Sequence, residues 1–462
     1  MRPIYSLLAI LAQPLLRAKL RRRGVAEPGY VHAVDERFGH YTMARPDADA
    51  AAGRPLVWIH AVSLGETRAA AILLAALRQR LPAMRLLLTH GTATGRAEGQ
   101  KLLVEGDVQV WQPWDTPAAT RQFLRHFRPD VGVLMETEVW PNLVAACVSE
   151  GVPLGLANGR LSEKSLHGAR RAGWLMRPAY SALSAVWAQT ALDAARYAAL
   201  GAPVAGVLGN LKFDADPDPM QRAQGQTWRA ALAPRAVLML ASSREGEEAM
   251  FLEQIKASIG TGAASNAIQS IVNELPPSVA RPLWLIVPRH PQRFAEVVAL
   301  ARAAGLNVAE RSTWSDPPPD ALQADVWIGD SIGEMALYYS LADMALLGGS
   351  FEPLGGQNLI EAAACGCPVL MGPHTFNFAQ AAELALGEGA ALRVSNMRVA
   401  VEEAGSLLAD CAHLNAMRDA SIRFSIAHRG AAARTADAVV GLLAGRLGPY
   451  AARGADGTAA FR

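Results

Sequence analysis

The stretch "LVWIHAVSLGE", residues 56–66, begins as an apolar run and ends in a short polar group. An apolar run of this length that leads into a helix-length segment is typical of a buried strand in a parallel sheet, because helices cover both faces of such a sheet. Ser63 and Glu66 form a capping box, which marks the start of a helix. The stretch therefore predicts one strand–turn–helix unit of an α/β fold.

The same alternation recurs in two blocks. Apolar runs lie at 56–62, 84–90, 108–114, 129–136, 152–159 and 184–190, and again at 236–243, 282–290, 324–331, 342–350 and 367–374. The stretch between the blocks, 207–219, is rich in Asp and Pro and breaks the periodicity. We predict an α/β protein with two doubly wound halves and a ligand cleft between them, at the carboxyl ends of their strands. Residues 260–282 predict a surface insertion, and the helical tail 430–447 is expected to cross back onto the first half.

Composition supports a folded chain with more than one core. The chain has 462 residues, of which 51% are hydrophobic and 19% charged, and its net charge is +2. These values exclude a disordered protein and suggest two domains. The four cysteines lack the spacing of a zinc site, which indicates a reducing compartment, no metal and no other cofactor.

The N-terminus combines an apolar segment, residues 4–16, with five cations, Arg17, Lys19, Arg21, Arg22 and Arg23. The segment is too short to cross a bilayer, and its cations follow the apolar run instead of preceding it, unlike those of a signal peptide. Two interpretations stand. The segment is an interfacial anchor on an anionic membrane, or it is a helix docked on its own domain.

Several motifs that define other enzyme classes do not occur. The first strand is not followed by G-x-G-x-x-G, and the chain has no P-loop, no zinc-hydrolase His pair and no G-x-S-x-G. The glycine-rich stretch "GGSFEPLGGQN", residues 348–358, instead fits a phosphate-bearing ligand held by backbone N–H groups near Ser350 and Asn358. Arg289 adds a fixed positive charge. A nucleotide bound without a metal suits this pattern.

A series of motifs carries a family resemblance. They are "ERFGHY", "HAVSLGE", "METEVWPN", "LANGRLS", "LKFD", "SSREGEE", "VPRHPQRF", "GGSFEPLGGQN" and "MGPHTFNF". In this order they resemble bacterial 3-deoxy-D-manno-octulosonic acid (Kdo) transferases of the GT-B fold, from about residue 5 to 425. The resemblance implies inverting transfer of Kdo from CMP-Kdo to the lipid A precursor lipid IVA, without a bound metal. It also implies a peripheral or monotopic protein on the cytoplasmic side of the inner membrane.

The resemblance assigns parts to segments of this chain. They are a membrane-associated helix with its basic collar (1–25), a Rossmann-like acceptor-binding domain (26–208), a linker (209–219), a Rossmann-like nucleotide-sugar-binding domain (220–428), and a C-terminal helix and tail (429–462). The implied partners are CMP-Kdo, lipid IVA and an anionic membrane surface, with no nucleic acid.

Glu36 of "ERFG" matches the family segment that supplies the general base, and Asp35 is its nearest rival. The implied nucleotide and donor contacts are Lys212, Arg289, His290, Gly349, Ser350, Asn358 and Glu361. The implied acceptor and cleft residues are Ser63, Gly65, Glu66, Glu136 and Glu138. Helix capping alone also explains Ser63 with Glu66, and Asn358 with Glu361.

Two other functions suit the same pattern. A nucleotide-sugar epimerase uses the same two-domain fold, and a non-catalytic membrane protein could bind a nucleotide sugar. The basic, apolar N-terminus favours the transferase over a soluble epimerase, and the acidic residues at several strand ends favour an enzyme over a binding protein.

Overall fold

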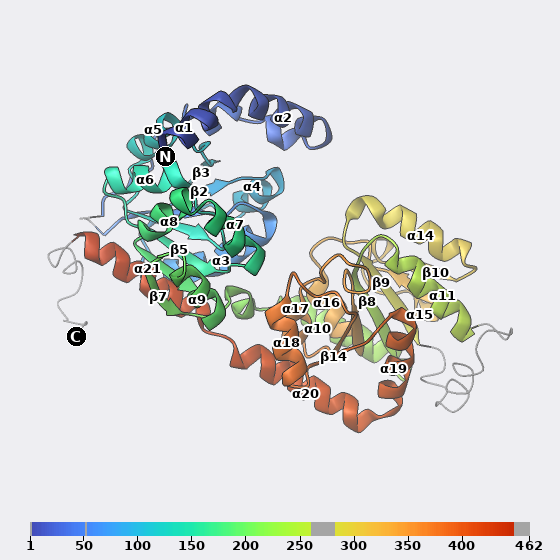
Figure 1. The fold of residues 1–462 in the computed structure, drawn as a ribbon. Coiled ribbons are helices and arrows are strands. Elements are labelled where there is room, and N and C mark those ends of the chain that lie inside the picture. Colours follow the sequence, from blue (N-terminus) through green and yellow to red (C-terminus); the bar gives the residue numbers. More distant parts are fainter. Residues whose placement is uncertain (1, 51–52, 260–281, 448–462) are drawn as a thin grey trace. The chain divides into compact units, whose positions relative to one another are not determined.

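The computed structural model describes residues 2–50, 53–259 and 282–447. The chain divides into two compact units (Figure 1), which are unit 1, Met1–Asp214 with Arg429–Arg462, and unit 2, Ala215–His428. The chain thus leaves unit 1 once and returns to it at its C-terminal end. The predicted insertion at 260–282, except for its last residue, and the tail from 448 lie outside the described residues.

Unit 1 is built on a parallel sheet in the order β3-β2-β1-β4-β5-β6-β7. Its strands are β1 (Leu56–His60), β2 (Arg85–His90), β3 (Val108–Trp111), β4 (Val131–Met135), β5 (Leu154–Gly159), β6 (Ala185–Ala188) and β7 (Val204–Val207). Its α-helices are α1 (Arg2–Leu11), α2 (Gln13–Ala26), α3 (Leu64–Arg80), α4 (Ala93–Gln100), α5 (Pro117–Phe127), α6 (Pro141–Ser149), α7 (Glu163–Arg171), α8 (Gly173–Ser181), α9 (Ala191–Ala198) and α21 (Ala431–Leu447). Short 3₁₀ turns are η1 (Pro28–Val31), η2 (Val34–Phe38) and η3 (Leu211–Asp214).

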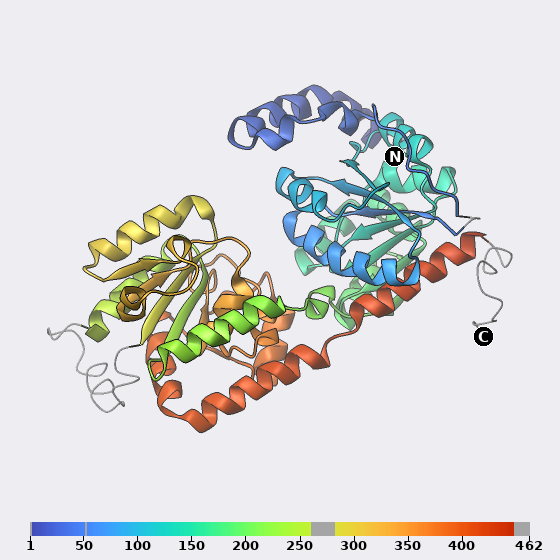
Figure 2. The ribbon, with the colours of Figure 1, turned by 180° about the vertical axis from the view of Figure 1, so that it is seen from behind.

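Successive residues of β1 enter two different cores because side chains alternate across a sheet. Leu56 and Trp58 pack in the core that includes residues of α5, α6 and α8. Val57 and Ile59 pack in the opposite core, which includes residues of α3 and α21. The C-terminal helix α21, red in Figure 2, lies beside α3 and completes this layer. The prediction that the helical tail returns to the first half is confirmed.

Unit 2 has a second parallel sheet, in the order β10-β11-β9-β8-β12-β13-β14. Its strands are β8 (Val237–Ser243), β9 (Leu283–Pro288), β10 (Val308–Glu310), β11 (Val326–Ile328), β12 (Met344–Leu347), β13 (Val369–Met371) and β14 (Ala391–Arg393). Its α-helices are α10 (Pro219–Leu232), α11 (Glu247–Ile259), α14 (Phe294–Ala303), α15 (Pro319–Gln323), α16 (Met335–Leu341), α17 (Leu359–Ala364), α18 (Ala379–Gly387), α19 (Met397–Ala409) and α20 (Cys411–Ala427). Its 3₁₀ turns are η4 (Pro291–Arg293) and η5 (Arg311–Thr313).

Each sheet has a point where the strand order reverses. In unit 1 this point lies between β1 and β4, and in unit 2 it lies between β8 and β12. Ligands of doubly wound folds bind where loops leave the carboxyl ends of the strands beside such a point. The segments that leave these strands are the ones that carry the predicted polar motifs.

The prediction of two doubly wound α/β halves is confirmed, whereas three strands were missed. These are β7, β10 and β14, all of them three or four residues long. They lie at or beside the edges of their sheets, where β7 alternates between exposed and half-buried residues. A short strand at an edge needs no continuous apolar run, so the sequence pattern does not mark it.

The N-terminal helices α1 and α2 dock on unit 1 and also expose apolar side chains. The Ser6 hydroxyl on α1 donates to Asn142 Oδ1 at 2.9 Å, and both residues are buried. Leu20 on α2 is buried as well. The exposed large apolar residues of the two helices are Ile4, Leu7, Leu8, Ile10, Leu11, Leu15 and Val25. Within the described part of the chain, no helix has both the length and the hydropathy needed to span a bilayer.

Candidate active site

Glu36 lies in η2, a 3₁₀ turn that ends at Phe38 and is capped by Gly39. Gly39 has φ +90°, and a Cβ there would lie 3.0 Å from the Cα of Ala119 on α5. The glycine of "ERFG" therefore allows both a left-handed backbone and a close approach to α5. This approach fixes the turn that carries Glu36 against unit 1.

The Glu36 carboxylate is buried, and one of its oxygens is fully engaged. Oε2 accepts from the Arg96 guanidinium at 2.7 Å and from the Trp111 backbone N–H at 2.8 Å. No hydrogen bond to Oε1 occurs within the described residues. The arrangement holds one edge of the carboxylate and leaves the other for a ligand.

Aromatic rings and a second cation complete this environment. The Arg37 guanidinium stacks 3.8 Å above the Trp111 ring and donates to the Gly91 carbonyl at 3.1 Å. Burial lowers the pKa of Arg37 to about 10. Arg37 remains a cation at neutral pH, so Glu36 lies between two arginines, Arg37 and Arg96.

Ser63 and Glu66 make the predicted capping contacts at the start of α3. Ser63 Oγ accepts from the Glu66 N–H at 3.4 Å, and the Glu66 carboxylate accepts from the Val62 N–H at 2.8 Å. Gly65 lies in the first turn between them, where it is exposed. Capping thus accounts for this motif locally, whether or not it also binds a ligand.

Glu66 belongs to an acidic group with Glu136 and Glu138, which follow β4. Burial raises the pKa of Glu66 to about 7, and the charges of the other two carboxylates contribute to the rise. Burial also raises the pKa of Glu138, whose Oε2 accepts from the Trp140 indole N–H at 2.7 Å. The predicted acceptor residues therefore share one electrostatic environment at the switch point of unit 1.

Lys212 pairs with this acidic group. Its Nζ lies 3.1 Å from Glu136 Oε1, which also accepts from the Asn158 side chain at 3.4 Å. Glu136 has φ +57° and Asn158 has φ +54°, so both occupy left-handed conformations that non-glycine residues rarely adopt. Lys212 was grouped with the donor contacts, but the structure places it in unit 1, against a predicted acceptor residue.

In unit 2, a buried carboxylate holds the glycine loop, residues 348–358. Glu247 is completely buried and accepts from the backbone N–H groups of Gly349 at 2.7 Å and Phe351 at 3.1 Å. It also accepts from the N–H of Arg244 at 2.9 Å. Part of the anion-binding capacity of the loop is thus taken up by a side chain of the protein itself.

The two residues predicted to lie near the phosphate, Gly349 and Ser350, make contacts within the protein. The Ser350 side chain is fully buried, and its hydroxyl bonds the Leu347 carbonyl and the Gly372 N–H. A Cβ on Gly348 would collide with the carbonyl oxygen of Ser242 at the end of β8. The Gly349 N–H donates to Glu247. These three residues therefore shape the loop against its own protein.

Asn358 and Glu361 lie at the start of α17. Asn358 Oδ1 accepts from the Ile360 N–H at 3.1 Å, so Asn358 is the N-cap of this helix. Glu361 lies in the first turn, half-buried, and its charge contributes to raising the pKa of the buried Tyr339, after burial itself. The cap that the sequence predicted is present.

A basic group follows β8 and β9 and consists of Arg244, Arg289, His290 and Arg293. Burial lowers the pKa of His290, and the charges of the arginines lower it further. Arg293 is neutralised by Glu248 at 2.7 Å and Glu296 at 3.0 Å. Arg289 is exposed, and its N–H donates to the Ser243 carbonyl at 3.0 Å. The predicted donor residues Arg289 and His290 thus lie in a positively charged region.

Comparison with known proteins identifies the family. A family model described as 3-deoxy-D-manno-octulosonic-acid transferase (kdotransferase) matches residues 32–215. A 3-deoxy-D-manno-octulosonic acid transferase of Bordetella pertussis is 46% identical over 447 residues, which are 95% of this chain and 98% of the relative. The chain belongs to the Kdo transferase family. A Kdo transferase of Haemophilus influenzae is 30% identical over 87% of this chain and 88% of its own.

Solved structures resemble the Kdo transferase chain in fold. A UDP-GlcNAc 2-epimerase from Neisseria meningitidis bound to UDP-GlcNAc has a TM-score of 0.54 at 14% identity, with 84% of this chain and 99% of that one covered. A glycosyltransferase from Rickettsia africae has a TM-score of 0.54 at 12% identity, with the same coverage. These similarities support the GT-B fold. The predicted resemblance to Kdo transferases is confirmed, and so is the assignment as a glycosyltransferase.

In the structure of this Kdo transferase family member, some of the predicted site residues lie close together, and residues that the sequence did not predict contact them. The acidic group and Lys212 meet in unit 1, and Arg289 and His290 meet in unit 2. Sequence reasoning assigned no part to Arg96, Trp111 or Glu247. Glu247 stands in the quoted motif "SSREGEE", directly after Gly246 and four residues after the end of β8, and that position was the available signal. No group of three or more His, Cys, Asp or Glu side chains suited to a metal occurs in the part of the chain that the structure describes.

Proposed function

We propose that the protein transfers Kdo from CMP-Kdo to lipid IVA with inversion of the anomeric centre, at the cytoplasmic face of the inner membrane. The observation that carries this proposal is Glu36, a buried carboxylate held at one oxygen by Arg96 and the Trp111 N–H. It lies in the segment that follows the apolar helix α1 and the basic helix α2, where a lipid acceptor would arrive.

Inverting transfer needs one base. The acceptor hydroxyl loses its proton to Glu36 Oε1 as its oxygen forms a bond with the anomeric carbon of Kdo. The bond from that carbon to the phosphate oxygen breaks, and its electron pair leaves with CMP. Arg96 and the Trp111 N–H hold the carboxylate in orientation, which is how a second contact positions a general base.

The donor is anionic, and unit 2 offers the matching charge. CMP-Kdo carries a phosphate and a carboxylate, and Arg289 with His290 lies after β9 beside the switch point. Fixed positive charge stabilises the phosphate as it leaves, so no separate acid is required. Asn358 and Glu361 are proposed to contact the nucleotide, next to the loop that Glu247 holds in shape.

Membrane association is supported by α1 and α2. Five apolar side chains of α1 are exposed, with exposed fractions from 46% to 64%, and Lys19, Arg21 and Arg22 of α2 are exposed as well. An exposed apolar helix face followed by cations suits the surface of an anionic bilayer. The helices are docked on unit 1 and still expose apolar side chains, so docking leaves a surface that a membrane could contact.

Incubation of the protein with CMP-Kdo and lipid IVA, followed by mass spectrometry of the lipid, tests the proposal. We expect the mass of lipid IVA to rise by one or more Kdo residues and CMP to be released. A lipid of unchanged mass together with an altered nucleotide sugar would favour an epimerase instead. Binding of CMP-Kdo with neither product would favour a non-catalytic binding protein.

A further inference from the structure

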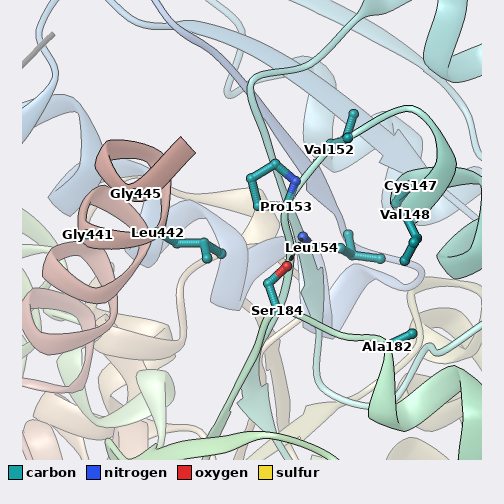
Figure 3. Close-up of a pocket in the computed structure, with 11 residues that line it drawn as sticks. Cys147, Val148, Val152, Pro153, Leu154, Ala182, Ser184, Gly441, Leu442 and Gly445 are labelled. Carbon is teal, nitrogen blue, oxygen red and sulfur yellow. Dashed lines mark hydrogen bonds between the residues drawn. The ribbon is translucent and has the colours of Figure 1, made fainter. Parts of the chain in front are cut away.

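Two mainly apolar hollows of unit 1 lie next to each other along α6. The first, of about 440 Å³, lies between α6 and α8. The second, of about 450 Å³, continues past the start of β5 to α21 (Figure 3). Both are lined by Val148 and Ala182, so they share a wall. We call the two together the α6 groove. Each hollow has the volume of a small-molecule site.

The walls of the α6 groove are mostly apolar and come from helices α6, α8 and α21 and from the segment that leads into β5; the polar Ser184 is among them, and its hydroxyl accepts from the Leu154 N–H. α6 contributes Pro141, Val144, Ala145 and Val148, which recur at the spacing of one helix face. From α21, the wall includes Gly441 and Gly445. A Cβ on either glycine would meet no atom within 4 Å, so the space beside α21 is open.

The groove has one charged residue, at one end, among the described residues that line it. That residue is Arg2. Arg2 is the first residue of α1, so the rim of the groove adjoins the helix with the exposed apolar face. Trp174, a second lining residue, is 48% exposed. A large exposed apolar surface beside a cation marks contact with a lipid.

The groove also begins next to the acceptor residues. α6 starts at Pro141, directly after the segment that carries Glu136 and Glu138. A molecule whose polar head lies at these carboxyl ends can therefore extend an apolar chain between α6 and α8. A bound peptide fits less well, because its backbone N–H and C=O groups would find no partners on these apolar walls.

We propose that the α6 groove binds one acyl chain of the lipid acceptor, with Arg2 pairing with a phosphate of the same lipid. The identity of the acceptor rests on the proposed function. An acyl chain is flexible, apolar and without hydrogen-bonding groups, and an arginine binds phosphate through two N–H donors. The groove thus selects acylated over deacylated acceptors, a preference that the catalytic residues cannot supply.

Filling the groove tests the proposal. In Gly441→Leu and Ala182→Leu, a larger side chain occupies the space of the acyl chain, and leucine is favourable in a helix where glycine is not. The matched control is Gly168→Leu on α7, an exposed helical glycine of unit 1 with open space around it and no part in the groove. We measure kcat/KM for lipid IVA and for its fully deacylated form.

In wild type, acylation should raise kcat/KM, and in both groove variants this advantage should fall about tenfold. The Gly168→Leu control should keep the full advantage. An unchanged ratio in the groove variants would overturn the inference while leaving the proposed function intact. If wild type transfers Kdo to neither acceptor, the proposed function itself fails.

A second measurement does not depend on turnover. Lipid IVA with brominated acyl chains should quench the fluorescence that Trp174 contributes, obtained as the difference between wild type and Trp174→Phe. The quenching should fall in Ala182→Leu, because Ala182 lines both hollows, and it should be kept in Gly168→Leu. Absence of quenching in wild type would refute an acyl chain in the groove. Brominated phosphatidylglycerol is the competing probe. If it quenches Trp174 and excess lipid IVA does not displace it, the groove binds a bilayer lipid and the acceptor assignment is wrong.

Discussion

Asp35 and Glu36 are neighbouring carboxylates in opposite environments. Asp35 has a side chain that is 72% exposed, and it forms a surface pair with Arg17 at 3.3 Å. Glu36 is buried and pairs with Arg96 at 2.7 Å. Exposed pairs contribute little, whereas a buried carboxylate with a fixed orientation suits proton transfer. The two residues therefore provide a matched pair of variants.

We expect Glu36→Gln to lower the rate of Kdo transfer by about 10²–10⁴, because a general base is lost. Asp35→Asn should stay within about twofold of wild type, since an exposed pair is removed. The transfer rate is measured beside CMP affinity and thermal unfolding, which separate loss of the base from loss of the Arg96 pair. A near wild-type rate in a folded Glu36→Gln protein would move the role to Glu66, Glu136 or Glu138.

Glu247 is expected to act as a positioning residue for the glycine loop. Glu247→Gln replaces an oxygen that accepts backbone N–H groups by an NH₂ group, so a buried donor faces other donors. The loss of loop order should weaken CMP binding about tenfold and destabilise the protein by about 1–3 kcal/mol.

The control for Glu247→Gln is Glu245→Gln, two residues earlier, where the side chain is 57% exposed and pairs only at the surface with Arg244. Calorimetric titration with CMP measures both variants. Equal CMP affinity in Glu247→Gln and wild type would show that the loop holds its shape without this carboxylate.

Glu66 predicts a pH dependence of stability. Burial raises its pKa to about 7 from 4.5, so the folded protein binds this proton more tightly than the unfolded chain. The stability from protonated Glu66 is fully present below pH 4.5 and is lost as the pH rises through 7. The free energy of unfolding should fall between pH 5 and 8 by up to about 3 kcal/mol in wild type.

Glu66→Gln removes the titrating group and keeps a side-chain oxygen for the Val62 N–H. Its free energy of unfolding should therefore change less with pH than that of wild type. Urea denaturation of both proteins at pH 5 and pH 8 checks this expectation. Parallel behaviour of the two proteins would assign the pH dependence to other groups.

Single residues differ in how far the sequence predicts them. Glu36, Glu66 and Asn358 stand in local motifs whose spacing can be read directly. The contact of Glu36 with Arg96 joins residues 60 positions apart, and that of Glu247 with Gly349 joins residues 102 apart. Parallel strands bring such loops to one edge of a sheet, but side-chain packing selects the partners. No local pattern encodes that selection.

Among the elements, α2 carries two kinds of cation, those that stack on aromatic rings of unit 1 and those that do not. Arg17 stacks 3.6 Å above the Phe38 ring, and Arg23 lies over Tyr30 at 5.2 Å. Lys19, Arg21 and Arg22 are exposed. Arg17 and Arg23 therefore contribute to docking, although Arg23 is exposed as well, and Lys19, Arg21 and Arg22 are the cations that we expect to contact anionic lipid.

We expect Lys19→Gln, Arg21→Gln and Arg22→Gln together to reduce flotation with anionic vesicles, because each cation near such a surface contributes about 1 kcal/mol. The charge-matched control replaces Lys164, Arg170 and Arg171 of α7, which are also exposed. Flotation in low salt, with and without phosphatidylglycerol, is the measurement. Equal losses in both triple variants would mean that net charge, not α2, governs binding.

At the scale of the whole molecule, unit 2 is inserted between two parts of unit 1. Val439 on α21 is completely buried in the core that also holds Val57 and Leu73. Val439→Asp places an unpaired charge there and should destabilise unit 1 by several kcal/mol. Ala433→Asp, on the exposed face of the same helix, should have little effect.

Hydrogen exchange read strand by strand distinguishes the two units. In Val439→Asp, β1 and β4 should lose protection while β8 and β12 keep it. Loss of protection in both sheets at once would show that the units unfold as one, contrary to their separate cores.

Because α21 belongs to unit 1 but lies at the C-terminal end of the chain, unit 1 is completed only after unit 2 has been synthesised. β1, β4 and α3 leave the ribosome long before α21, because all of unit 2 is translated in between. At 5–20 residues per second, the 215–447 portion takes about 10–50 s. For that time one face of the first sheet lacks its last helix, and its apolar residues stay open to chaperones. The face of the first sheet that α21 covers in the finished protein is therefore the part of unit 1 that needs chaperone protection longest during synthesis.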